Sequence, residues 1–198
     1  MASGMQERTM LTTAVKMDPL VNGRVSVHPI SPTRAEVRIA GELPIVWPER
    51  FAAALAPRAI SILHGEAERR GESWTGFFEL DSKQTQDNVA EIDYASILQS
   101  LPIARQARPI AVLHHGLVRL TNALRLAIQA EDRQGLLADM LAKLKHLGLY
   151  PKRLTVDAES GIVTQCFWLT GYGDREPDLQ TERTLREFLS SSRKVRRS

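Results

Sequence analysis

The sequence predicts an α+β fold of two similar modules in tandem, each with an antiparallel sheet and helices on one face. Segments in which apolar and polar residues alternate are typical of half-buried strands, and segments of helical periodicity lie between them. The order of these segments repeats after 88 to 89 residues, which indicates an internal repeat. The 198 residues are 43% hydrophobic and 25% charged, the usual balance of a globular protein with a real core.

The first half opens with two alternating segments, residues 24–30 and 34–40, which predict paired strands across a proline-containing turn. Residues 48–55 are rich in alanine and begin with proline, which predicts a short helix. Residues 59–68 and 74–80 flank a charged turn that contains glycine, and they predict a hairpin.

Two further segments complete the first half. Apolar residues at helical spacing predict a helix over residues 89–101, which Pro102 ends. The apolar segment 109–120 predicts one strand on each side of His114-His115-Gly116.

The second half follows the same order with clearer periodicity. Residues 124–130 alternate as a strand, and residues 136–147 carry one apolar helical stripe that ends at Gly148, a typical C-cap. Residues 154–158 and 163–169 predict a hairpin, and Asp178 is placed to cap a last helix.

The repeat aligns Glu36 with Leu124 and Phe78 with Phe167, at offsets of 88 and 89 residues. Strand, helix, strand, strand and helix, with room for one more strand, make the ferredoxin-like βαββαβ unit. We therefore expect an irregular segment over residues 1–22, modules over 23–120 and 121–190, and a basic tail over 191–198. The polar tail leaves the second module without its own last strand, and the strand at 24–30 is a candidate to fill such a vacancy.

The loop between the strand at 124–130 and the next helix carries the clearest chemical signal. It reads Glu-Asp-Arg-Gln-Gly-Leu-Leu-Ala-Asp over residues 131–139. Backbone N–H groups at a helix start suit a ligand carboxylate, and Asp132 could pair with a ligand ammonium. The alternative is that Asp132 only caps the helix and that Gly135 only permits a close turn.

The residues that carry a family resemblance in the second half are this loop, Leu-Gly-Leu at 147–149, Gly161 and Phe167. By these residues the second half resembles the ACT domain, a ligand-binding module of amino-acid metabolism. The pattern looks most like the tandem ACT pairs of bacterial PII uridylyltransferases and plant ACT-repeat proteins. The resemblance implies an amino-acid site whose residues follow the motif: Asp132, Arg133, Gln134, Gly135 and Leu136. The corresponding first-half loop, residues 41–48, lacks the motif, so the first module resembles a degenerate copy.

Other features exclude several classes of function. The tail contributes four of the positive charges, which leaves the body near neutral, so nucleic-acid binding is unlikely except through the tail. Adjacent His114 and His115 in a strand point to opposite faces, and Cys166 has no histidine near it in sequence. We therefore expect no catalytic residues, no metal and no cofactor, and hence no enzyme. No apolar run reaches the ~18 residues that span a membrane, and we expect a cytoplasmic protein or one of an organelle stroma.

These observations give one leading hypothesis and two alternatives. The first is a regulator that binds a small amino acid and controls a partner enzyme of amino-acid or nitrogen metabolism. The second is a ligand-free interaction or assembly subunit, partnered by an enzyme or by itself through its sheets; Trp168 and Cys166 on the strand face opposite Phe167 favour such an interface. The third is RNA binding through the basic tail.

Overall fold

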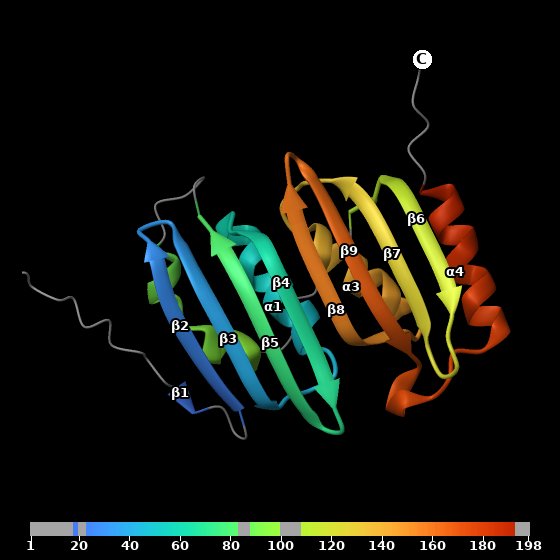
Figure 1. The fold of residues 1–198 in the computed structure, drawn as a ribbon, viewed down its shortest axis with the longest axis horizontal. Helices are drawn as coiled ribbons and strands as arrows, with labels where there is room; N and C mark the ends of the chain where they lie inside the picture. Colours follow the sequence, from blue (N-terminus) through green and yellow to red (C-terminus); the bar gives the residue numbers. More distant parts are fainter. Residues whose placement is uncertain (1–17, 20–22, 83–87, 100–107, 193–198) are drawn as a thin grey trace, which may run out of the picture.

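The computed structural model describes residues 18–19, 23–82, 88–99 and 108–192, and it has the predicted α+β architecture. Nine strands form one sheet in the order β1-β2-β3-β5-β4-β8-β9-β7-β6, with every neighbouring pair antiparallel. The first half of the chain builds one side of this sheet and the second half builds the other (Figure 1).

Most element bounds lie close to the predicted ones, and the exceptions are residues 89–101 and 109–120. The elements of the first half are β1 (Asp18–Pro19), β2 (Gly23–Ser31), β3 (Arg34–Glu42), α1 (Trp47–Leu55), η1 (Ala56–Arg58), β4 (Ser61–Arg70), β5 (Ser73–Asp81), η2 (Val89–Glu91) and α2 (Tyr94–Gln99). Those of the second half are β6 (Val112–Arg119), β7 (Leu124–Glu131), α3 (Leu136–His146), β8 (Tyr150–Glu159), β9 (Ile162–Thr170), η3 (Tyr172–Asp174) and α4 (Leu179–Ser191).

The repeat is regular at the level of whole elements. The second-half elements β6, α3, β8 and β9 each begin 89 residues after β2, α1, β4 and β5. Each half has the chain order strand, strand, helix, strand, strand, helix, and each has the same strand order across the sheet. Residues of α1, β4 and β5 therefore have structural counterparts 89 positions later in α3, β8 and β9.

The expectation that the strand at 24–30 fills the place of the second module's missing last strand was wrong, because β6 takes that place. β2 pairs with β3 of its own half, and β6 pairs with β7. The expected module boundary at residue 120 assigned residues 112–119 to the first half. In the structure these residues form β6, which hydrogen-bonds to β7 of the second half. The expectation of two short strands around His114-His115-Gly116 was wrong. One strand continues through the segment, and a bulge between Val112 and His114 absorbs the irregular pattern.

The predicted helix over residues 89–101 was also too long. The described part contains η2 and, after a break at Ile92 and Asp93, the short helix α2. Residues 100–107 lie outside the described ranges, as do residues 1–17, 20–22 and the tail residues 193–198, so the expectations for these segments are not addressed. Among the described residues, no helix has the length and apolar character needed to cross a membrane.

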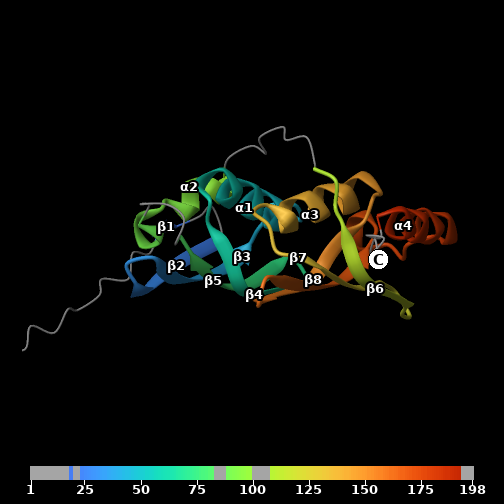
Figure 2. The same cartoon turned by 90° about the horizontal axis from the view of Figure 1, so that it is seen from above.

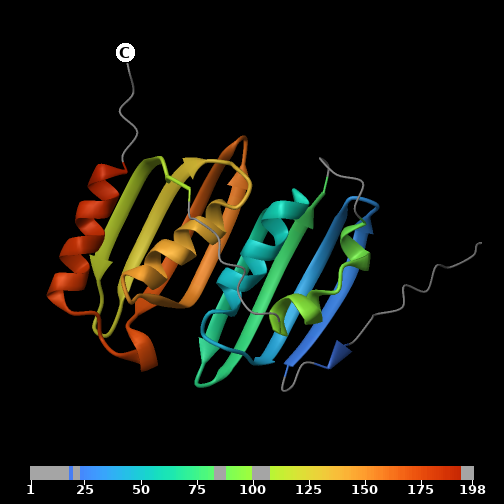
Figure 3. The ribbon, with the colours of Figure 1, turned by 180° about the vertical axis from the view of Figure 1, so that it is seen from behind.

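Helices α1, α2 and α3 cover one face of the sheet, and α4 lies along its outer edge beside β6 (Figures 2 and 3). The opposite face carries no helix, and we call it the open face. On the covered face, Trp47, Phe51, Trp74 and Phe78 are fully buried and pack ring against ring. Such aromatic packing stabilises the first half beyond the area it buries.

The two halves join through strands and helices alike. β4 pairs with β8, which removes the exposed edge that each half would otherwise present to solvent. On the covered face α1 packs against α3, and Lys145 Nζ lies 2.7 Å from a Glu49 carboxylate oxygen. The loop predicted to bind a ligand lies at this junction.

Candidate functional site

A small pocket opens at the junction, and residues of both halves line it. Its volume is about 40 Å³, room for two or three water molecules. All five predicted site residues, Asp132 through Leu136, contribute to its wall. The other lining residues are Ala52, Ile60, Ser61, Ile62, Leu137, Val156, Val163 and Gln165.

The loop from β7 to α3 turns sharply at Gly135, whose φ of 75° and ψ of 11° lie in the left-handed region. A residue with a Cβ is strained there, so the predicted turn glycine is required by the backbone. Gly135 itself occupies the N-cap position, and α3 begins with no side-chain cap. The Leu136 N–H donates to the Arg133 carbonyl oxygen, and the buried Asp139 carboxylate lies in the first turn, so the remaining N–H groups at this helix start are the candidates for an anion.

Asp132 does not cap α3, and the capping interpretation was wrong. It lies three residues before the N-cap, and its own N–H donates to the Gly161 carbonyl oxygen at 2.8 Å. Partial burial raises the pKa of the Asp132 carboxyl, although the Arg133 N–H donates to it and acts in the opposite direction. The carboxylate therefore has a cost of desolvation that a ligand cation would offset.

Arg133 lines the pocket but its guanidinium is committed elsewhere. Nη1 lies 2.6 Å from Oδ2 of Asp139, whose side chain is 1% exposed, and Nη2 donates to the Pro109 carbonyl oxygen at 3.1 Å. A bond between a buried carboxylate and arginine is strong and directional. Arg133 thus braces the loop against α3 and against the segment before β6.

Gln165 is the site residue that the sequence interpretation missed. It lies on β9 facing the helices, it is 1% exposed, and its Oε1 has no hydrogen-bond partner among the residues that the structure describes. Leaving a buried amide oxygen unpaired costs about 1–3 kcal/mol. The signal was present in the sequence, because Gln165 interrupts the apolar row Val163, Phe167 and Leu169.

The equivalent position in the first half is filled by the chain itself. Counting back 89 residues places Trp47 where Leu136 stands and Gly76 where Gln165 stands. A Cβ on Gly76 would lie 2.9 Å from the Trp47 ring, so the tryptophan occupies that space. The gap that remains there has a volume of about 10 Å³, too small for an amino acid.

The other candidates of the sequence do not assemble into a site. His114 pairs with Gln129 and His115 with Ile128, which places the two imidazoles on opposite faces of the sheet. His64 Nδ1 lies 3.6 Å from Asp157 Oδ1 on the exposed face of β4 and β8. In the part of the chain that the structure describes, no three histidine, cysteine, aspartate or glutamate side chains form a metal-binding group.

Comparison of the chain with protein-family models, with curated proteins and with solved structures finds no match.

Proposed function

We propose that this chain is a tandem ACT protein that binds a small amino acid at the junction pocket and regulates a partner enzyme. The observation that carries the proposal is the buried Gln165 Oε1, which no described residue hydrogen-bonds, in a pocket lined by the predicted loop. A buried polar atom of this kind is normally satisfied, so its presence favours a ligand.

The chemistry of the pocket matches the two charges of an amino acid. The uncapped first turn of α3 suits the carboxylate, since its N–H groups and the helix dipole both favour an anion. Asp132 and Gln165 Oε1 suit the ammonium group, because both present acceptor oxygens. Ile62, Val156 and Val163 supply apolar walls, and the small volume favours a small neutral amino acid.

One ligand per chain follows from the difference between the halves. Trp47 fills the position in the first half that is open in the second, and Leu43 stands where the second half has Asp132. The first module then acts as the wall that closes the site of the second. Control of an enzyme of amino-acid or nitrogen metabolism in the cytoplasm, or in an organelle stroma, is the corresponding physiological proposal.

Isothermal titration calorimetry against the twenty amino acids tests the proposal. We expect one or a few small neutral amino acids to bind with a stoichiometry of one per chain. Asp132→Ala should weaken that binding by about tenfold or more, since it removes a charge-assisted contact. Asp157→Ala, which removes an exposed carboxylate on the open face, is the matched control and should bind normally. Absence of binding by all twenty would end the sensor hypothesis.

A ligand-free assembly subunit is the second candidate, and the filled site of the first half favours it. The same fold then serves only to present surfaces. Affinity capture from native extract separates the two, because an assembly subunit retains its partner enzyme in the Asp132→Ala variant and without added amino acids. A partner whose capture depends on an amino acid supports the first candidate instead.

A further inference from the structure

The open face of the sheet presents three rows of side chains that run across the strands. Strand register places the members of each row side by side from β2 to β6. The first row is Arg24, Ala40, Thr75, Glu68, Arg153, Trp168, Arg125 and Val118. The second is Ser26, Arg38, Phe77, Glu66, Thr155, Cys166, Ala127 and Gly116. The third is His28, Glu36, Glu79, His64, Asp157, Thr164, Gln129 and His114.

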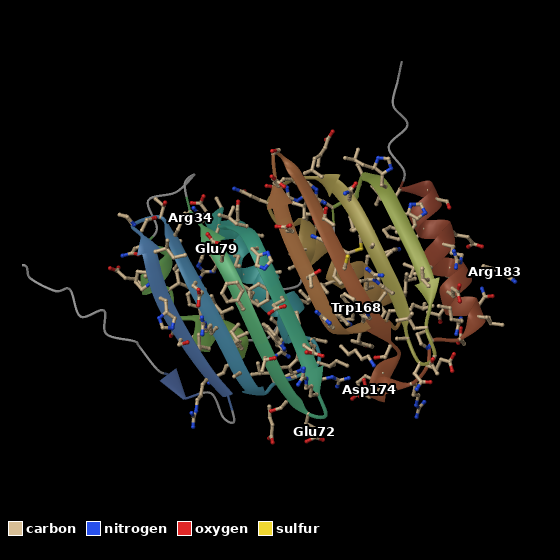
Figure 4. The ribbon with its side chains drawn as sticks, viewed as in Figure 1. Arg34, Glu72, Glu79, Trp168, Asp174 and Arg183 are labelled. Carbon is tan, nitrogen blue, oxygen red and sulfur yellow. The ribbon has the colours of Figure 1, made fainter. Side chains whose placement is uncertain are left out.

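In the second half, Trp168 on β9 lies half-buried on this face (Figure 4). The guanidinium carbons of Arg153 and Arg125 lie 4.8 Å and 5.5 Å from its ring centroid, one on each neighbouring strand. Two cation–π contacts hold the indole in place. The neighbouring members of the second row, Cys166 and Ala127, are small and uncharged. We call Arg125, Trp168 and Arg153 the knob.

In the first half, the same face is hollowed. A groove with a volume of about 440 Å³ runs over β3, β5 and β4, and Arg153 at its end belongs also to the knob. Phe77 and Thr75 lie in it, and Glu66 and Glu68 supply negative charge along β4. Arg38 and Arg153 line the groove as well, so it carries both signs of charge. Its acidic side is Glu66 and Glu68 along β4, next to the aromatic surface of Phe77, and this side complements the positive charge of the knob.

We propose that two copies of this chain associate through their open faces, with the knob of each copy in the groove of the other. The knob strand β9 and the groove strand β5 lie equally far from the β4–β8 boundary, one strand beyond it on each side. A twofold axis parallel to the strands at that boundary places β9 of one copy over β5 of the other. This axis keeps each row at the same height along the strands. Because Trp168 and Thr75 belong to the same row, Trp168 of one copy lies over Thr75 in the groove of the other, and the symmetry produces this contact twice.

The charges agree with this axis along the whole face. It sets Glu68 against Arg153 of the second copy, and His64 against Asp157 of the second copy. The remaining charged positions of the rows meet neutral ones or histidine; for example, Arg125 faces Ala40 and Glu79 faces Thr164. No like charges of arginine or carboxylate meet, and a mismatch of that kind is the usual barrier to association.

The size of the face is adequate for a stable dimer. Eight strands about 4.8 Å apart, with rows about 7 Å apart, give a surface of about 40 by 20 Å. Such a surface buries about 800 Å² per copy, the standard size of a specific interface. Five carboxylates and four arginines in the three rows leave the face nearly neutral, which favours a protein partner over a nucleic acid.

Sedimentation of charge-reversed variants tests this arrangement. Glu68→Arg places arginine against Arg153 of the second copy, and Arg153→Glu places two glutamates together, so each variant alone should be monomeric where the natural chain is dimeric. A mixture of the two variants should form a dimer again, because each of its two contacts then joins opposite charges. If Glu68 and Arg153 acted only within one chain, mixing the two variants would not restore the dimer.

Two further results decide the proposal. Trp168→Ala should weaken self-association by about tenfold or more, as expected for a central aromatic, while circular dichroism shows that it remains folded. A natural chain that sediments as a monomer at micromolar concentration in low salt would overturn the proposal. So would a dimer that persists in all three variants, or a mixture that stays monomeric. The test does not involve amino-acid binding, so its outcome is independent of the proposed function.

Discussion

Glu66 on β4 lies directly opposite Thr155 on β8, and the two residues occupy the same position in the 89-residue repeat. A residue that pairs with its own counterpart marks a local twofold axis through the junction. The junction pocket and the space filled by Trp47 are therefore two versions of one site. What distinguishes them is side-chain chemistry alone.

Replacing Gln165 with leucine should stabilise the ligand-free protein. The change removes an unpaired buried oxygen at similar volume, so the free energy of unfolding should rise by about 1 kcal/mol. Urea denaturation without amino acids measures this. The same variant should lose amino-acid binding in calorimetry. A clear fall in stability would mean that Gln165 Oε1 is already satisfied in the folded protein.

Asp132→Asn should raise stability at neutral pH and leave it unchanged in acid. The folded-state pKa of Asp132 is raised by burial, so ionisation is less favourable in the folded chain than in the unfolded one. The natural protein therefore loses stability relative to the variant as pH rises from about 3.9, the unfolded pKa, through the folded pKa. The difference should stay below about 1 kcal/mol at pH 7. Thermal melts of both proteins from pH 2.5 to pH 7 measure it, and a less stable variant at pH 7 would contradict it.

Trp47→Ala should destabilise the first half strongly. The ring is fully buried against Trp74 and Phe78, and such a truncation costs about 3–5 kcal/mol. Its Nε1 is buried without an acceptor, which offsets part of the loss. Tyr172→Ala is the control, because that ring is 72% exposed and its removal should cost less than about 1 kcal/mol. Equal costs in chemical denaturation would show that the ring of Trp47 is not a packed core element.

The attachment of α4 should depend on the ionised form of Glu182. Arg186 and Arg119 bond to this carboxylate at 2.7 Å, and the two bonds lower its pKa. The stabilisation is therefore present at neutral pH and disappears as pH falls through the folded pKa, below about 4.3. Glu182→Gln should cost about 1 kcal/mol at pH 7 and nothing at pH 2.

Hydrogen exchange of the α4 amides checks this, because they should exchange faster in Glu182→Gln at pH 7 than in the natural protein. Glu187→Gln on the exposed side of the same helix is the control. Faster exchange in both variants would argue for a general effect of helix charge.

Local patterns were enough to predict most elements and the repeat. Residues 124–130 alternate between apolar and polar, and residues 136–147 carry a stripe of leucines. Both patterns reflect which face of the element is buried, and apolar residue types indicate that face directly. The motif loop was located for the same reason, since Gly135 signals a special backbone conformation. By contrast, the partner of β6 is a matter of pairing between strands, which residue types around His114 do not encode.

The site itself was only partly predictable. Asp132 precedes a helix in sequence, but the left-handed turn at Gly135 moves the cap to the glycine. Gln165 comes from a strand far along the chain, and Ser61 and Ile62 come from the other half. Trp47 can occupy the first-half site only because Gly76 has no side chain. These two residues lie on different elements, so local sequence patterns do not show the relation between them.

If the junction pocket binds an amino acid as proposed, the ring of Trp47 also limits the shape of the binding curve. A chain with one open site saturates along a simple hyperbola, because no second occupancy exists within it to couple to the first. A Hill coefficient above one would have to arise between chains. The steepness of the binding curve against amino-acid concentration would then depend on the number of chains in the assembly. It would not depend on the duplication within each chain.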